Sequence, residues 1–164
     1  MPLAKRNSGG APSTVYSFKT PDEARALASS LAQLCPDPEQ SRIGLMELLL
    51  NAVEHGNLGV SYAEKTELVQ QSAFHAELER RLRLPEYCDR TATVSVTRTD
   101  DEIHFLIRDQ GTGFDWSSYL EIDPVRVLDP NGRGIAWAKN VSFQHIEYHG
   151  IGNEVLAVIV TTSG

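Results

Sequence analysis

The chain has 164 residues, of which 41% are hydrophobic, and a formal net charge of −7 at pH 7. This length suits one domain with a sizeable core, and the acidic balance argues against a nucleic-acid surface, which normally carries a basic patch. No segment approaches the roughly 18 uninterrupted apolar residues of a membrane span, and the first ten residues contain no apolar signal core. The two cysteines have no metal-ligand spacing. We therefore expect a cytoplasmic protein with no membrane or nucleic-acid partner.

The N-terminal third predicts a tail, a strand and a helix. Residues 1–13 are rich in Gly, Ser, Pro and basic residues, so we expect a flexible tail ahead of a single domain over residues 14–164. Residues 15–19 alternate like an edge strand. Thr20-Pro-Asp-Glu23 has the form of a capping box with Pro at the first helical position. The helix that follows should end at Cys35-Pro36.

A second helix carries the most informative pattern. Asp37-Pro-Glu-Gln40 repeats the start signal, Gly56 offers a stop, and residues 43–53 are apolar nearly all round. Four polar residues interrupt this pattern at i, i+4, i+7 and i+8: Glu47, Asn51, Glu54 and His55. A buried carboxylate or amide costs several kcal/mol unless it is paired. The stripe should therefore face water, a partner group or a ligand, and a helix with one solvated face is the plainer alternative.

The rest of the chain predicts a charged helix and a sheet. A third helix, from Ser61 to about Leu84, is interpreted as a solvated amphipathic helix or as a partner-docking surface. Strands are expected over residues 91–98, 102–108, 142–148 and 154–161. The last strand is apolar on both faces, which places it centrally in the sheet. The predicted fold is an α/β two-layer sandwich with a mixed, mostly antiparallel sheet and helices on one face.

Two glycine-rich segments follow the predicted strand at 102–108. Asp109-Gln-Gly111-Thr-Gly113 has two glycines one residue apart, which allow a sharp turn and a close approach to a flat ligand. Its aspartate can accept a hydrogen bond from an exocyclic amine. Asn131-Gly132-Arg133-Gly134 precedes a predicted helix start, where backbone N–H groups suit phosphate oxygens. Taken singly, each segment also fits an ordinary turn. Residues 114–130, which lie between the two segments, would form a lid.

These segments, in this order, resemble the GHKL ATPase superfamily, with its Bergerat-type ATP-binding fold, and within it the anti-sigma-factor serine kinases. The resemblance runs from about residue 14 to residue 160, and residues 47–57 match the family's N box. It implies ATP and Mg²⁺ as ligands. Asn51 would hold Mg²⁺, Glu47 would be the general base, and Asp109 would bind the adenine amino group.

The resemblance also assigns the glycines. Gly111 and Gly113 would line the base and ribose, while Gly132, Arg133 and Gly134 would close over the phosphates. Related kinases often carry a Thr on the last hairpin near the adenine. This chain has Gly150-Ile-Gly152-Asn153 there, where Asn153 could replace that contact or hold a turn.

Two functional classes follow from the resemblance. In the first, the chain is an anti-sigma factor that binds a sigma factor and phosphorylates a serine of an anti-sigma antagonist; Glu47 favours this class. In the second, it is a non-catalytic, nucleotide-dependent protein-binding module in a phosphatase or two-component signalling pathway. A third possibility is an α/β domain without nucleotide affinity. The family includes homodimers, although no surface in the sequence indicates one.

Overall fold

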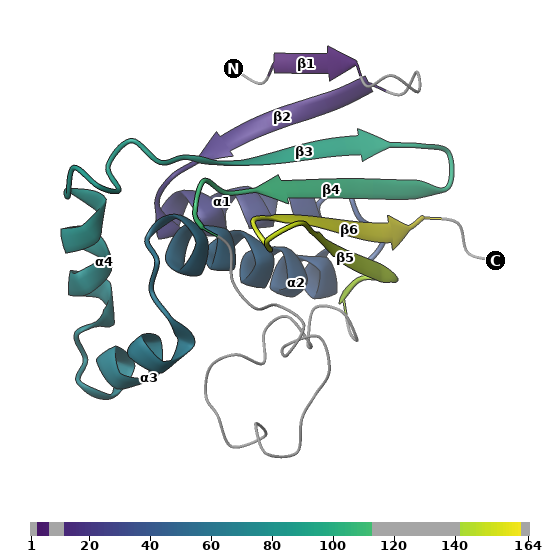
Figure 1. Cartoon of the computed structure of the whole chain (residues 1–164). Coiled ribbons are helices and arrows are strands. Elements are labelled where there is room, and N and C mark those ends of the chain that lie inside the picture. The colour runs from purple at the N-terminus through teal and green to yellow at the C-terminus, as the bar shows by residue number, and fades with distance from the viewer. Residues whose placement is uncertain (1–2, 7–11, 113–141, 162–164) are drawn as a thin grey trace.

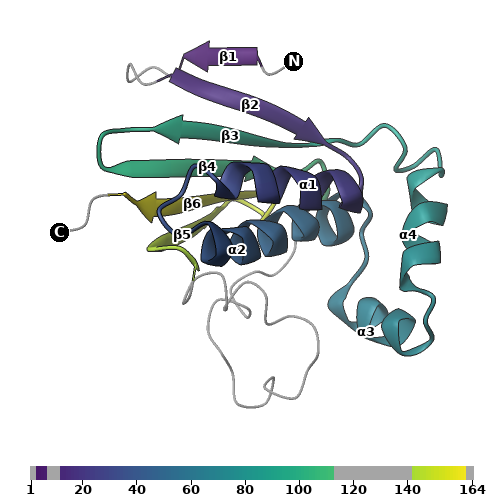
Figure 2. The ribbon, with the colours of Figure 1, turned by 180° about the vertical axis from the view of Figure 1, so that it is seen from behind.

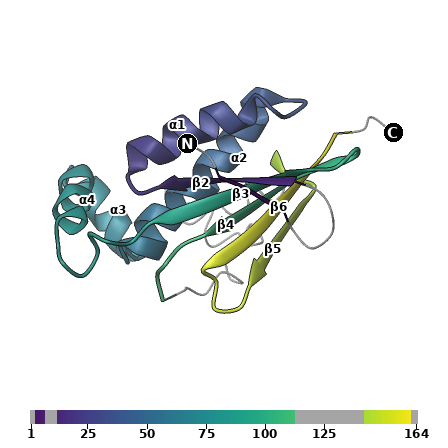
Figure 3. The ribbon, with the colours of Figure 1, turned by 90° about the horizontal axis from the view of Figure 1, so that it is seen from above.

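The computed structural model describes residues 3–6, 12–112 and 142–161 as two layers, with α1 and α2 covering one face of an antiparallel sheet (Figures 1 and 3). The strands are β1 (Leu3–Arg6), β2 (Pro12–Phe18), β3 (Ala92–Arg98), β4 (Glu102–Arg108), β5 (His145–His149) and β6 (Glu154–Val160). The helices are α1 (Pro21–Ala32), α2 (Pro38–Asn51), the π-helix η1 (Ala52–Asn57), α3 (Tyr62–Gln70) and α4 (Phe74–Leu82). The predicted α/β two-layer sandwich is confirmed.

The sheet has the strand order β1-β2-β3-β4-β6-β5. Each neighbouring pair that the structure describes is antiparallel, which agrees with the predicted mostly antiparallel sheet. β6 lies between β4 and β5, so its predicted central position is confirmed. Alternate residues of β3 and β4 are buried on the face that the helices cover: Val94, Val96, Ile103, Phe105 and Ile107. They form the core together with apolar residues of α1 and α2.

Both core helices begin where the sequence predicts. The side-chain oxygen of Thr20 accepts a hydrogen bond from the Glu23 N–H at 3.1 Å, and Asp37 accepts one from the Gln40 N–H at 3.2 Å. Each cap is followed by Pro, whose fixed φ suits the first helical turn. The first helix ends at Ala32, before the predicted end, because the chain tightens into i→i+3 hydrogen bonds ahead of Pro36.

Two predictions about the N-terminus are wrong. Leu3–Arg6, expected in a flexible tail, forms β1 and pairs antiparallel with β2. β2 is therefore flanked by β1 and β3 and is not an edge strand. Strand pairing overrides local composition here, since β1 gains its hydrogen bonds from β2, the next strand along the chain.

The predicted third helix is two helices. α3 and α4 are separated at residues 71–73, where Ser72 has a φ of 55°, a left-handed conformation that ends a helix. No residue of α3 is buried, whereas Leu78 of α4 packs into the core. The two helices, called here the α3–α4 arm (Tyr62–Leu82), extend beyond one end of the sandwich (Figures 1 and 2). Within the described ranges, no helix has the length and apolarity needed to cross a membrane.

Candidate functional site

The helix that carries the polar stripe does not stop at Gly56. It widens after Asn51 into the π-helix η1, in which the Leu58 N–H donates to the Val53 carbonyl five residues earlier at 2.9 Å. A Cβ on Gly56 would lie 2.4 Å from the carboxyl carbon of Asp109. Gly56, predicted as a stop, is therefore the position that lets the loop after β4 approach η1. Single π turns of this kind are frequent at functional sites.

The polar stripe lies inside the protein and does not form a solvated face. Asn51, Glu54 and His55 are 9%, 1% and 8% exposed, and Glu47 is partly buried. The Glu54 carboxylate is paired with the Lys65 ammonium of α3, whose Nζ lies 2.8 Å from Oε2. Since a buried charge needs such a partner, Glu54 forms an internal ion pair.

His55 is held as a neutral ring at the end of the stripe. Burial lowers its pKa to about 4, although its contact with the Val60 carbonyl opposes that change. Its Nδ1 hydrogen-bonds to that carbonyl, and the ring stacks on Tyr62 with centroids 3.9 Å apart. His55 therefore orders the turn after η1.

Asn51 faces a narrow crevice between α2 and the sheet. The crevice is lined by Leu48, Asn51, Ala52, Ile107, Asp109, Tyr148, Gly152, Asn153, Glu154 and Val155. Its cavity volume is about 10 Å³, enough for about one water molecule. The Nδ2 of Asn51 is buried and has no hydrogen-bond partner within the part of the chain that the structure describes. An unpaired buried amide of this kind costs about 1–3 kcal/mol.

Asp109 lies on the opposite wall of this crevice. Burial raises its pKa to about 6, against the lowering effects of the Gly111 N–H, which donates to Oδ1 at 2.8 Å, and of the Arg90 charge. A Cβ on Gly111 would lie 2.1 Å from the Gly56 carbonyl oxygen. Only a residue without a side chain allows this approach, so Gly56 and Gly111 together fix Asp109 at the crevice.

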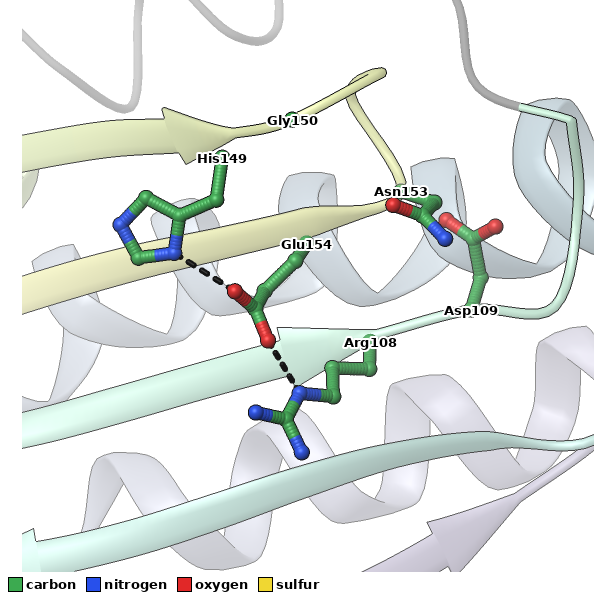
Figure 4. Close-up of a pocket in the computed structure, with 6 residues that line it drawn as sticks. All are labelled: Arg108, Asp109, His149, Gly150, Asn153 and Glu154. Atoms are coloured by element: carbon green, nitrogen blue, oxygen red, sulfur yellow. Dashed lines mark hydrogen bonds and ion pairs between the residues drawn. The ribbon is translucent and has the colours of Figure 1, made fainter.

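A wider pocket lies at the same end of the sheet, on the face away from the helices, and shares Asp109, Asn153 and Glu154 with the crevice (Figure 4). Its volume is about 270 Å³, and it is lined by Arg108, Asp109, His149, Gly150, Asn153 and Glu154. Glu154 lies between two basic side chains: it accepts from Arg108 Nε and lies 2.6 Å from His149 Nδ1. The side chains of Asp109 and Asn153 lie next to each other at the inner end, where the Asp109 N–H also donates to the Asn153 carbonyl at 3.0 Å.

Glu47 lies one helical turn before Asn51 and does not line the crevice. Burial raises its pKa; the positive charge of Lys65 lowers it and the negative charge of Glu54 raises it. A carboxylate with a raised pKa titrates closer to neutral pH, which suits a proton acceptor.

Of the residues that the sequence analysis singled out, Asn51, Asp109 and Asn153 line the same crevice, and Gly111 contacts it through its hydrogen bond to Asp109. The four remaining candidates, Gly113, Gly132, Arg133 and Gly134, and the predicted lid at 114–130 lie outside the described residues.

Sequence reasoning missed two further residues of the site. The Asn57 side chain accepts from the Gln110 N–H at 2.7 Å and so joins η1 to the glycine loop. Arg90 donates to the Asn57 carbonyl at 2.8 Å and places its charge near Asp109. Asn57 stands in the same glycine-containing turn as Gly56, a local signal that could have found it. Arg90 has no such signal, because only the fold brings residue 90 to this loop.

No family model matches this chain, and no curated protein matches it.

Proposed function

We propose that the chain binds ATP with Mg²⁺ at the crevice and acts as an anti-sigma factor with serine kinase activity toward an anti-sigma antagonist. The observation that carries the proposal is the buried Asn51 amide, which has an unpaired Nδ2. A ligand would supply the missing partner and offset the cost of burying this group. Asp109 supports the same site, because a carboxylate on the facing wall can accept a hydrogen bond from the adenine amine.

The crevice walls suit a flat base, since Leu48, Ile107 and Val155 are apolar and the polar groups are few. A volume of about 10 Å³ is too small for adenine, so binding has to widen the crevice. The turn between β5 and β6 forms one wall of the crevice, and its Gly150 and Gly152 have φ values of 59° and 96°, which glycine adopts without strain.

Asn51 offers an amide oxygen, one of the ligand types that Mg²⁺ accepts beside phosphates and water. When bound, the ion supplies neutralising charge at the phosphates. Glu47 would take the proton of the serine hydroxyl while the serine oxygen bonds to the γ-phosphorus and the bond to ADP breaks. Its raised pKa supports this assignment.

Ligand-induced stabilisation tests the binding step. ATP, ADP and adenosine, each with and without Mg²⁺, are added to the purified chain in a thermal unfolding assay. Ligand at 100 times its Kd stabilises the native state by about 2.7 kcal/mol. We expect stabilisation by ATP and loss of its Mg²⁺-dependent part in Asn51→Ala. Absence of any adenine-nucleotide effect on the unaltered chain would refute the proposal.

Transfer of labelled phosphate to an antagonist protein tests the catalytic step. We expect Glu47→Gln to keep nucleotide affinity and to lose about 10²- to 10⁴-fold in transfer rate. Unchanged transfer in that variant would remove Glu47 from the mechanism.

The free cysteines, Cys35 and Cys88, fit a reducing compartment, so we place this activity in the cytoplasm.

The second candidate function is a nucleotide-dependent protein-binding module without catalysis. The α3–α4 arm favours it, because Arg81 of α4 donates to the Leu58 carbonyl directly after η1 at 2.9 Å and so links the arm to the site helix. In that case ATP changes the affinity for a partner protein, no phosphate is transferred, and Glu47→Gln has no effect on partner binding.

A further inference from the structure

The end of η1, the segment before β3 and the loop after β4 are joined by a closed ring of three hydrogen bonds. The Gln110 N–H donates to Asn57 Oδ1 at 2.7 Å, and the Thr91 N–H donates to Gln110 Oε1, also at 2.7 Å. Arg90, the neighbour of Thr91, donates from its guanidinium to the Asn57 carbonyl at 2.8 Å and closes the ring. These four residues, Asn57, Arg90, Thr91 and Gln110, are called here the loop junction.

The loop junction is buried on one side and exposed on the other. Asn57 is the last residue of η1 and is 2% exposed, whereas Thr91 and Gln110 are exposed. The guanidinium of the half-buried Arg90 lies 5.2 Å from the centroid of the Tyr87 ring, a second contact that holds it. The Gln110 side chain can therefore be shortened without opening the core, which makes the loop junction accessible to mutation.

The loop junction fixes the residue next to it, Asp109. The Asp109 N–H donates to the Asn153 carbonyl at 3.0 Å, and the following N–H, that of Gln110, is held by Asn57. Because each peptide group is planar, holding the peptide groups on both sides of Asp109 sets its φ and ψ and the direction of its side chain. The Gly111 N–H then orients the carboxylate by donating to Oδ1 at 2.8 Å.

We propose that the loop junction, through Asn57 and Gln110, positions Asp109 to accept a hydrogen bond from the exocyclic amine of adenine, and so favours ATP over purine nucleotides that lack this amine. This inference rests on the proposed function, because it concerns the base end of the same site. Gln110 does not line the crevice, so it is a positioning residue that acts through Asp109.

Amide hydrogen exchange, measured by NMR without nucleotide, tests the positioning. Gln110→Ala removes the acceptor of the Thr91 N–H, and we expect the protection of this N–H and of the Gly111 N–H to fall about threefold to tenfold. Gln110→Glu, which keeps an acceptor oxygen, should restore it. Gln144→Ala is the matched control: its Oε1 accepts from the Val160 N–H at 2.9 Å at the opposite end of β6, and its loss should leave Gly111 unchanged.

Calorimetry with two nucleotides tests the functional consequence. Purine riboside triphosphate has the ring system and phosphates of ATP but no exocyclic amine. With Mg²⁺ present, we expect Gln110→Ala to raise the Kd of ATP about threefold to tenfold and to leave that of purine riboside triphosphate unchanged. In an Asp109→Asn background, Gln110→Ala should have no further effect on the Kd of ATP. Gln110→Glu should restore most of the ATP affinity, and Gln144→Ala should change neither Kd.

The outcomes separate this inference from the proposed function. Equal weakening of both nucleotides by Gln110→Ala would overturn the inference, because the loop junction would then be only a structural support. Unchanged protection of the Gly111 N–H, or an unchanged Kd of ATP, would overturn it too and leave the ATP site standing. An unaltered chain that binds neither nucleotide would refute the proposed function and the role of the loop junction with it, whatever hydrogen exchange shows.

Discussion

Asp109→Asn is expected to stabilise the protein at high pH while it weakens the proposed binding of ATP. The folded state raises the pKa of Asp109 from 3.8 to about 6, chiefly through burial. Because the pKa of Asp109 is higher in the folded state, this group does not destabilise the fold below about pH 3.8. As the pH rises from about 3.8 to about 6, the free energy of unfolding decreases. The full change corresponds to about 3 kcal/mol. Partial exposure of the carboxylate reduces this to about 1–2 kcal/mol.

Urea unfolding of the unaltered chain and Asp109→Asn at about pH 4 and about pH 8 measures this effect. We expect the variant to gain about 1–2 kcal/mol relative to the unaltered chain between the two pH values. Asp100→Asn, on the exposed β3–β4 turn, is the control for the general effect of removing a carboxylate. An equal effect of Asp109→Asn at both pH values would refute the burial of this group. Calorimetry with ATP should show weaker binding, since an amide cannot replace the acceptor oxygen pair.

Three further predictions concern the fold. Gly111→Ala should destabilise the protein by about 1–3 kcal/mol in urea unfolding, because its Cβ would lie 2.1 Å from the backbone of η1. The control, Gly150→Asn, lies in open space at a positive φ that Asn tolerates, so it should lose less stability. Equal losses would contradict the close approach of Gly111 to η1. Phe105→Ala should lower the free energy of unfolding by about 3–5 kcal/mol, because it removes a buried core side chain. The control Val69→Ala, at an exposed position, should lower it by less than about 0.5 kcal/mol. A small loss at Phe105 would contradict the sheet register. Thr20→Ala should lose about 1 kcal/mol, seen as a lower thermal midpoint; no change would mean that water replaces the cap.

The helix starts and the strand faces could be predicted because their signals are local. Thr20 and Asp37 cap their helices with side chains three residues from the N–H groups that they satisfy. In β3 and β4 the period of two places every second side chain on the core face, which identifies that face without knowledge of the partner strand. Even the interior position of β6 follows from apolar residues on both of its faces.

Predictions failed where the local pattern does not reveal the pairing, contact or backbone conformation that decides the structure. β1 pairs with β2 only through a hydrogen-bonding partner that composition does not reveal. The predicted stop at Gly56 is close to the end of η1 at Asn57, but the sequence did not predict that the Asp109 side chain packs against Gly56. Ser72 divides the predicted third helix through a left-handed φ that its sequence neighbours do not demand.

The sequence by itself determined the helix that presents Glu47, Asn51 and Glu54, and the strand that ends directly before Asp109, since each depends on spacing within one segment. Only the tertiary structure decided that Asn51 is left with an unpaired amide and that Lys65 neutralises Glu54. The physical reason is desolvation: the same carboxylate or amide is unremarkable in water, and its chemistry changes only when other segments exclude the water and supply, or withhold, a partner.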